Sequence, residues 1–238
     1  MSERSFVSTE TRNRIRAAIA PIGAAMGRAG ITPNAVTVVG FVGVCIAALA
    51  AAFEWWLAAG VLLLAFGIFD LFDGTLARAT GATSKLGAFL DSTFDRAGEA
   101  IVYIGIAAGS LAGGFEPGAI FTTAAMGAAF MVSYTRAKSE SLGFTPGTGM
   151  ANVGLAPREV RIALLTVGLL LTALLGGLSA TAVPGLCTGS SAPTCAPDGV
   201  VYSSGAFVLA GTLGIIAALA TLTTIQRVLH VRAQARED

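Results

Sequence analysis

Charged residues are scarce in this chain of 238 residues: Asp, Glu, Lys and Arg make up 12%, against about 25% in soluble domains. The single His and three Cys form no zinc-binding pattern. The net charge of +1 lacks the positive excess that a nucleic-acid-binding surface needs. Hydrophobic residues reach 54% and the mean hydropathy is +0.75. We therefore expect an integral membrane protein, and not a soluble enzyme, a disordered chain or a nucleic-acid-binding protein.

Six apolar stretches are long enough to cross a bilayer, which takes about 20 residues as a helix. They cover 34–53, 55–78, 86–112, 117–139, 158–183 and 202–228. The sequence thus predicts an all-α polytopic membrane protein, with six transmembrane helices in a domain at 31–229 and a tail at 230–238.

Lys and Arg are absent from three long stretches, 29–77, 97–135 and 162–226. Each stretch holds a pair of expected helices and their connecting turn, so all 15 positive residues fall at one face of the membrane. The positive-inside rule makes that face cytoplasmic, with both termini inside and a multi-pass location in the plasma membrane. The loop 184–201 then lies outside, where Cys187 and Cys195 form either a disulfide or two free thiols.

The N-terminal segment 1–30 contains apolar residues at helical spacing. Those on one face are Ile15, Ile19, Ile22 and Met26, flanked by Arg12, Arg14 and Arg16. The pattern predicts an amphipathic juxtamembrane helix on the anionic cytoplasmic leaflet. A helix packed against the bundle would show the same pattern.

Four carboxylates interrupt the second and third apolar stretches. Asp70 and Asp73 are three residues apart, and Asp91 and Asp95 are four apart, so each pair shares a helical face. The short turn near 79–85 makes the two helices antiparallel neighbours. Because ionisable groups inside spans are costly and usually mark function, we expect all four to converge at the cytoplasmic end.

Oxygen ligands of this kind suit Mg²⁺, Mn²⁺ or Ca²⁺. Four carboxylates would repel one another unless cations lie between them, and four can hold two ions. A two-metal site is a familiar arrangement for chemistry on phosphate esters. Nearby, Gly74 leaves the backbone open, Arg78 is able to pair with a phosphate and Ser84 offers a hydroxyl. Gly87 either admits a ligand or serves helix packing.

At these residues the sequence resembles the CDP-alcohol phosphotransferase family, whose pattern is D-x2-D-G-x2-A-R-x8-G-x3-D-x3-D. Every interval is matched, from Asp70 to Asp95. The resemblance implies transfer of a phosphatidyl group from CDP-diacylglycerol to an alcohol, with release of CMP. It implies two Mg²⁺ ions, or Mn²⁺, held by Asp70, Asp73, Asp91 and Asp95, with Asp95 as the general base. It also suggests a homodimer.

The resemblance further assigns contacts with the CDP donor. Those residues are Pro33, Asn34, Ala35, Val36, Gly74, Arg78 and Ser84. A carboxylate base is needed because an unactivated alcohol is a poor nucleophile. The site must lie near the membrane surface, since the donor is part lipid and part nucleotide.

A second basic cluster is expected at the cytoplasmic face, where it would bind an acceptor that is itself a phosphate. Its members are Arg136, Lys138, Arg158, Arg161 and Arg227. The arrangement is similar to actinobacterial phosphatidylinositol-phosphate synthases, whose acceptor is inositol 1-phosphate. Ordinary positive-inside anchoring would explain any single one of these residues.

The leading hypothesis is therefore a transferase that makes phosphatidylinositol phosphate. A phosphatidylglycerophosphate synthase and an inositol-phosphodiester synthase that uses CDP-inositol remain alternatives, because PREVR at 157–161 departs from the synthase pattern. A divalent-cation transporter is the alternative from another class. The outer halves of the expected spans are almost wholly apolar, so no ion path is visible.

Overall fold

The computed structural model describes residues 21, 25–80, 84–144, 153–182 and 200–236. The side chains at 69–75, 77–80, 180–182 and 200 lie outside this description. The predicted amphipathic helix falls mostly on residues outside the described part, although 25–28 are helical. Cys187 and Cys195, for which a disulfide and two free thiols are both expected alternatives, also lie outside it.

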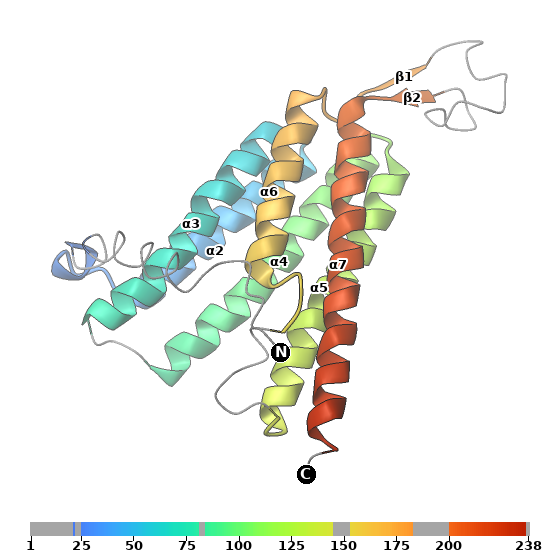
Figure 1. Cartoon of the computed structure of the whole chain (residues 1–238). Coiled ribbons are helices and arrows are strands. Elements are labelled where there is room, and N and C mark those ends of the chain that lie inside the picture. Colours follow the sequence, from blue (N-terminus) through green and yellow to red (C-terminus); the bar gives the residue numbers. More distant parts are fainter. Residues whose placement is uncertain (1–20, 22–24, 81–83, 145–152, 183–199, 237–238) are drawn as a thin grey trace.

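Six long helices form the body of the described chain. They are α2 (Pro33–Ala52), α3 (Trp56–Thr80), α4 (Lys85–Ala112), α5 (Glu116–Ser141), α6 (Arg158–Leu174) and α7 (Ser204–Gln234). Successive helices run in opposite directions (Figure 1). The ends predicted to lack Lys and Arg therefore lie together, and the basic ends of α5, α6 and α7 lie opposite them. The alternation agrees with the charge pattern of the sequence.

Side-chain caps mark where several helices begin. Thr32 caps α2 by accepting the N–H of Ala35 at 3.3 Å, and Pro33 occupies the first turn. Ser84 caps α4 by accepting the N–H of Gly87 at 2.9 Å. These caps place the starts of α2 and α4 at the end of the bundle where the expected carboxylate site lies.

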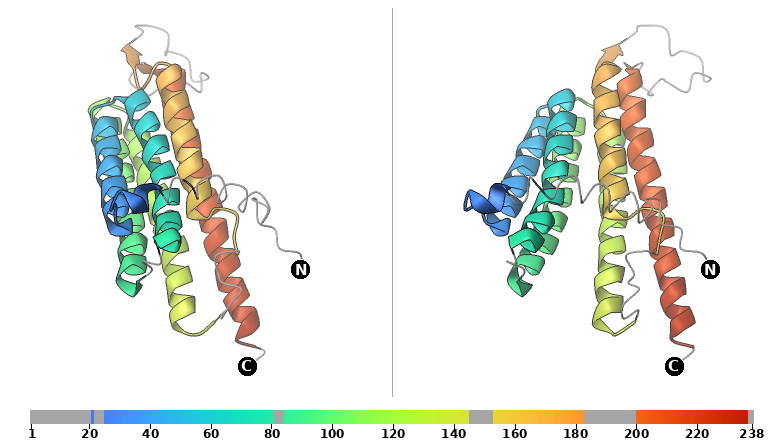
Figure 2. Two further views of the ribbon diagram at one scale, coloured as in Figure 1. Left: turned by 90° about the vertical axis from the view of Figure 1, so that its left-hand side faces the viewer. Right: turned by 60° about the vertical axis from the view of Figure 1, so that its left-hand side comes forward.

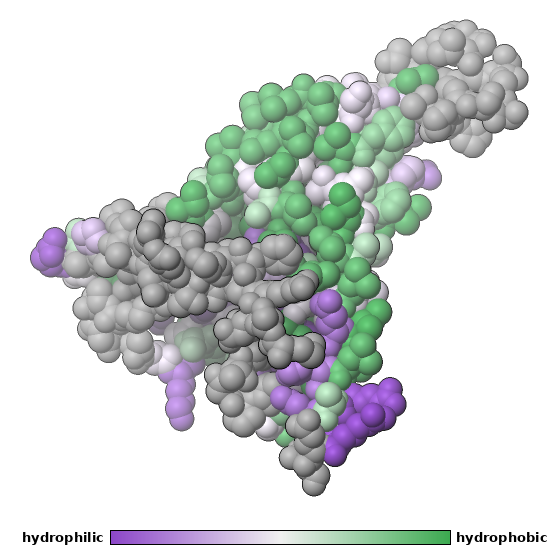
Figure 3. Space-filling model, in the orientation of Figure 1, coloured by the Kyte–Doolittle hydropathy of each residue, from purple (hydrophilic) through white to green (hydrophobic). Residues whose placement is uncertain are grey.

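Within the described chain, three helices are long and apolar enough to cross a membrane: α2, α5 and α7. The apolar part of α3, Trp56–Ile68, is shorter. Figure 3 shows apolar residues over the upper part of one face and hydrophilic residues gathered near the end where α7 finishes. This division places the polar chemistry at one end of an apolar body.

Close backbone contact holds α2 against α4. A Cβ on Gly105 would overlap the carbonyl oxygen of Ala48, and a Cβ on Gly109 would overlap that of Ala51. The main core runs through the bundle between the helices, and its largest members are Tyr103, Leu63, Ile106, Leu165, Leu169, Leu209, Leu213 and Ile216. At the polar end, α3 and the start of α4 incline away from α5 and α7 (Figure 2).

The fifth apolar stretch, predicted as one helix over 158–183, forms a shorter helix in the structure. Helix α6 ends at Leu174, because Gly176 (φ 95°) and Gly177 (φ 65°) adopt backbone conformations that favour glycine. The chain continues as β1 (Ala180–Ala182), which pairs antiparallel with β2 (Val200–Tyr202). The Tyr202 hydroxyl donates to the Gly114 carbonyl at 3.0 Å. This two-stranded ribbon is the one addition to the predicted all-α fold in the described chain.

Candidate functional site

Two ion pairs connect α4 to α6 near the polar end of the bundle. Asp95 Oδ1 lies 2.8 Å from Arg158 Nη1. One turn further along α4, Glu99 contacts Arg161. The spacing is four residues on α4 and three on α6, so both pairs use the same face of each helix. We call these two pairs the ion-pair ladder.

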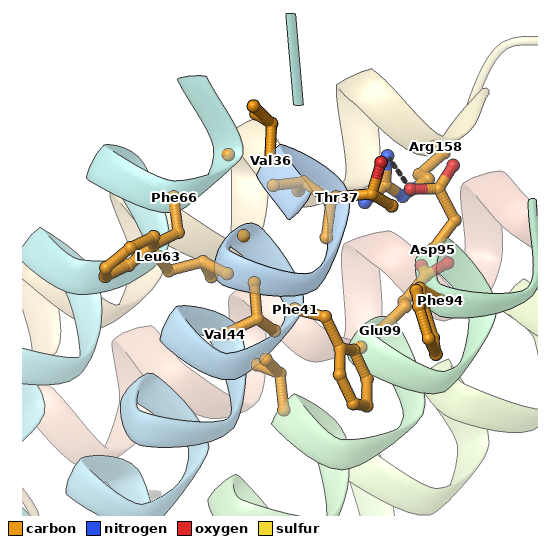
Figure 4. A pocket seen from close by; sticks show the side chains of 15 residues that line it. Val36, Thr37, Phe41, Val44, Leu63, Phe66, Phe94, Asp95, Glu99 and Arg158 are labelled. Carbon is orange, nitrogen blue, oxygen red and sulfur yellow. Dashed lines mark ion pairs between the residues drawn. The ribbon is translucent and has the colours of Figure 1, made fainter. Parts of the chain in front are cut away.

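The outer pair of the ladder is partly accessible. The side chains of Asp95 and Arg158 are 18% and 21% exposed. Arg96 adds a second cation, with its Nη1 atom 3.7 Å from Asp95 Oδ2. Both Asp95 and Arg158 line a pocket, where Figure 4 shows them pointing toward each other. The Asp95 carboxylate therefore lies beside a cation and is accessible to a molecule bound in the pocket.

Apolar side chains from α2, α3 and α4 also line this pocket. Phe41 of α2 stacks on Phe94 of α4 with ring centroids 4.8 Å apart. Leu63 and Phe66 of α3 line the pocket on another side, together with Thr37 of α2 (Figure 4). The pocket therefore has a charged end and an apolar end, which suits a ligand that is polar at one end and hydrophobic at the other.

The inner pair of the ladder is buried. Arg161 Nε donates to Glu99 Oε1 and Arg161 Nη2 donates to Glu99 Oε2, both at 2.7 Å. The two side chains are only 1% and 4% exposed. Arg161 Nη1 also donates to the carbonyl of Ala156 at 2.9 Å. The guanidinium therefore bonds to groups of the protein itself on all three of its nitrogens.

Helix α7 holds the segment that leads into α6, residues 153–157. Thr223 Oγ1 accepts the backbone N–H of Leu155 at 3.0 Å and that of Ala156 at 2.9 Å. Arg227 Nε donates to the Val153 carbonyl at 3.0 Å, and Arg227 Nη1 donates to the Val132 carbonyl. The start of α6 is thereby attached to α5 and α7 as well as to α4.

The structure separates the five basic residues predicted to bind an acceptor phosphate. Arg158 and Lys138 are accessible, and Arg136 pairs with Glu140 at 2.9 Å on an exposed part of α5. Arg161 and Arg227 instead bond to the protein, and both are nearly inaccessible. For these two an acceptor-binding role stays a prediction, and their burial is new information, because a pattern of positive charges does not reveal which of them find buried partners.

The structure describes the side chains of two of the four predicted metal-binding carboxylates. Asp91 and Asp95 lie on α4 with the expected spacing of about one turn. Asp70 and Asp73 lie on α3, and their side chains are outside the described part. Among the described side chains, no group of three or more His, Cys, Asp or Glu gathers into a metal site. The convergence of all four thus stays a prediction.

The predicted donor contacts are placed in the same way. Pro33, Asn34, Ala35 and Val36 form the first turn of α2. A Cβ on Gly87 would lie 3.1 Å from Ser84 Oγ and 3.3 Å from Asn34 Oδ1, so the starts of α2 and α4 are adjacent. Gly74 and Arg78 lie on α3, where side chains are outside the description. The structure therefore brings together those donor residues that it describes.

Sequence reasoning missed Glu99 and Thr223. A signal for Glu99 was present, because it continues the four-residue spacing of Asp91 and Asp95 along one helical face. Thr223 carried no such signal. Its role depends on a contact with residues 155 and 156, which are distant in the sequence.

Fold and site together define a helical membrane protein with acidic and basic groups facing each other at one end of its bundle. The chain belongs to the CDP-alcohol phosphatidyltransferase family, whose model matches residues 30–189. It is therefore an enzyme of the transferase class, and the cation-transporter alternative is set aside.

Named relatives and solved structures agree with this assignment. The chain is 35% identical over 179 residues to archaetidylinositol phosphate synthase of Pyrococcus horikoshii, covering 74% of this chain and 88% of the relative. It is 31% identical over 226 residues to phosphatidylinositol phosphate synthase of Streptomyces avermitilis, covering 92% and 80%. The Mycobacterium tuberculosis phosphatidylinositol phosphate synthase with CDP-DAG bound has the same fold, with a TM-score of 0.68, 23% identity and coverage of 90% and 92%.

Proposed function

We propose that this protein transfers a phosphatidyl group from CDP-diacylglycerol to a hydroxyl of inositol 1-phosphate, giving phosphatidylinositol phosphate and CMP. Family membership supports the reaction type. Relatives named phosphatidylinositol or archaetidylinositol phosphate synthase support the acceptor. The observation that carries the proposal is the 2.8 Å contact between Asp95 and Arg158, which joins a candidate base to a candidate phosphate-binding cation.

Asp95 acts as the general base in this proposal. A phosphate held by Arg158 would place the rest of the acceptor beside Asp95, within reach of its carboxylate. Asp95 takes the proton of the acceptor hydroxyl as the new O–P bond forms. The bond between the phosphatidyl phosphorus and the bridging oxygen of the pyrophosphate breaks, and CMP leaves with that oxygen and the electron pair of the broken bond. Arg136 and Lys138 add positive charge for the acceptor phosphate.

A divalent cation belongs to this site. The solved M. tuberculosis fold relative includes a complex with manganese and citrate. We propose that Asp70, Asp73, Asp91 and Asp95 hold two Mg²⁺ ions, a set of hard oxygen ligands that suits this metal. When bound, the ions would neutralise the pyrophosphate and stabilise the leaving group. Asp91 and Asp95 are the described members of the set.

The donor spans two environments, and the proposed site does the same. Its nucleotide would contact the starts of α2 and α4, with Pro33, Asn34, Ala35, Val36 and Ser84, and the α3 residues Gly74 and Arg78. Adjacency of Asn34, Ser84 and Gly87 supports one binding surface made of two helix starts. The apolar end of the pocket supports a lipid-bearing donor.

We further propose a multi-pass protein of the plasma membrane with six spans in a catalytic domain at 31–229. The N-terminal segment 1–30 would lie on the cytoplasmic leaflet as an amphipathic helix, and the tail 230–238 would be cytoplasmic. The antiparallel order of the six helices and the gathering of Lys and Arg at one end support this orientation. A homodimer is proposed from the family resemblance.

The test is a CMP-release assay on the purified protein in detergent with Mg²⁺ and CDP-diacylglycerol. Inositol 1-phosphate, free inositol, glycerol 3-phosphate and serine are added one at a time. Of the four acceptors, only inositol 1-phosphate is expected to cause CMP release. Addition of EDTA should abolish this release until Mg²⁺ or Mn²⁺ is restored. Release only with glycerol 3-phosphate would identify the phosphatidylglycerophosphate alternative. In a parallel assay CDP-inositol replaces CDP-diacylglycerol. Turnover only with CDP-inositol would overturn the proposal that CDP-diacylglycerol is the donor.

A further inference from the structure

The inner pair of the ion-pair ladder is nearly inaccessible, although Glu99 lines the pocket, and it lies directly beside the outer pair. Glu99 follows Asp95 by one turn of α4, and Arg161 follows Arg158 by nearly one turn of α6. Because side chains at these spacings share a helical face, the separation and rotation of α4 and α6 set by one pair also apply to the other. The planar fork of Arg161 bonds both oxygens of Glu99, which restricts that rotation further.

Arg161 also holds the chain just before Arg158. Its Nη1 atom donates to the carbonyl of Ala156, two residues ahead of Arg158. The N–H of the same Ala156 donates to Thr223 of α7. The backbone that leads into Arg158 is therefore fixed on its carbonyl side by Arg161 and on its amide side by Thr223.

We propose that Glu99 and Arg161 are positioning residues, which hold Arg158 against Asp95 so that an acceptor phosphate and the base are correctly placed. This inference rests on the function proposed above. Burying an ion pair is costly and seldom improves stability over an apolar pair of similar size. The geometry that the buried pair imposes on its accessible neighbour explains what the pair contributes beyond stability.

The experiment compares Glu99→Gln, Arg161→Gln and the double variant in detergent. Three quantities are measured: the thermal midpoint, the rise in that midpoint with inositol 1-phosphate or with CMP and Mg²⁺, and the KM for each substrate. Each single variant is expected to have a lower midpoint and an acceptor KM raised about tenfold or more, as for loss of a charged hydrogen bond. The donor KM should change by less than about threefold.

The double variant separates positioning from stability. Removing both partners leaves no unpaired buried charge, so its thermal midpoint should recover toward that of the wild type. Its acceptor KM should stay raised, and the midpoint rise with inositol 1-phosphate should stay small, because the Ala156 carbonyl has lost its donor and the buried pair no longer fixes α4 against α6 beside Arg158. Leu213→Ala is the matched control, since it lowers the midpoint by opening a cavity in the core and leaves both KM values unchanged.

Two results would overturn the inference while the proposed function stands. One is an acceptor KM that recovers together with the thermal midpoint in the double variant, which would show a purely structural role. The other is a wild-type acceptor KM in all three variants. If the wild-type protein shows neither turnover nor a midpoint rise with inositol 1-phosphate, the proposed function fails and the inference fails with it.

Discussion

Asp95 on α4 and Arg158 on α6 bring a carboxylate and a guanidinium to within 2.8 Å of each other in the lining of a pocket that also has an apolar end. The contact links the acidic motif of α4 to the start of α6. In the proposed function this one pair supplies both the base and the cation for the acceptor phosphate, and the first two predictions address its two members.

Replacing Asp95 by Asn should abolish turnover and preserve binding of the donor. The amide has nearly the same shape but accepts no proton, and loss of a general base costs about 10²–10⁴-fold in rate. CMP release measures turnover, and the midpoint rise with CDP-diacylglycerol measures donor binding. Glu159→Gln removes an exposed carboxylate at the start of α6 and serves as the control. Turnover at the wild-type rate in Asp95→Asn would refute its role as base.

Replacing Arg158 by Ala should raise the acceptor KM about tenfold or more, with a much smaller change in the donor KM. Arg158→Lys keeps the charge and loses the planar fork, so its acceptor KM should lie between those of the wild type and Arg158→Ala. Arg232→Ala is the matched control, because this exposed arginine lies at the same end of the bundle, in the last turn of α7. Equal effects of Arg158→Ala on both KM values would contradict an acceptor-binding role.

Thr223→Val should lower the free energy of unfolding by about 2 kcal/mol, since the backbone N–H groups of Leu155 and Ala156 lose their acceptor. Thermal unfolding in detergent measures the change. The neighbouring Thr224 bonds only within its own helix among the described contacts, to the Ala220 carbonyl. Thr224→Val should therefore change stability by less than about 0.5 kcal/mol. Equal losses in the two variants would argue against the proposed attachment of 153–157 to α7.

Gly105→Ala should destabilise the protein by about 1–3 kcal/mol, because the added methyl would overlap the Ala48 carbonyl of α2. Gly127 of α5 is the control, since the described structure has no atom within 4 Å of a Cβ placed there. Gly127→Ala should be neutral or slightly stabilising, because alanine favours a helix by about 0.5–1 kcal/mol. The same thermal measurement applies, and similar losses at both sites would show that the α2–α4 contact is looser than described.

Much of the architecture follows from the sequence because each long apolar helix can be recognised from the composition of its own segment. Apolar length and the spacing of Lys and Arg predicted six helices close to those observed, and Asp91 and Asp95 fall on α4 as expected. The end of α6 was missed because Leu178 and its neighbours keep the segment apolar after the chain has turned at Gly176 and Gly177. Hydropathy records composition, whereas the helix end depends on two positive φ angles.

The partners of the arginines were less predictable for a different reason. Arg158 and Arg161 belong to one short motif and carry the same charge, so the sequence assigns them the same role. Only packing distinguishes them, since α4 offers an accessible carboxylate to one and a buried carboxylate to the other. The same holds for Arg227, whose acceptors are backbone carbonyls. Backbone acceptors exist at every residue, and no sequence pattern identifies them.

The hold of Thr223 and Arg227 on the segment before α6 has a consequence for how the protein is made. Both residues belong to α7, which is synthesised after α6. A nascent chain that has already inserted α2 to α6 contains Asp95 and Arg158 but lacks the contacts that fix residues 153–157. The backbone before Arg158 is therefore fixed only after α7 has been synthesised and packed, so a chain terminated before α7 would hold Arg158 less firmly against Asp95.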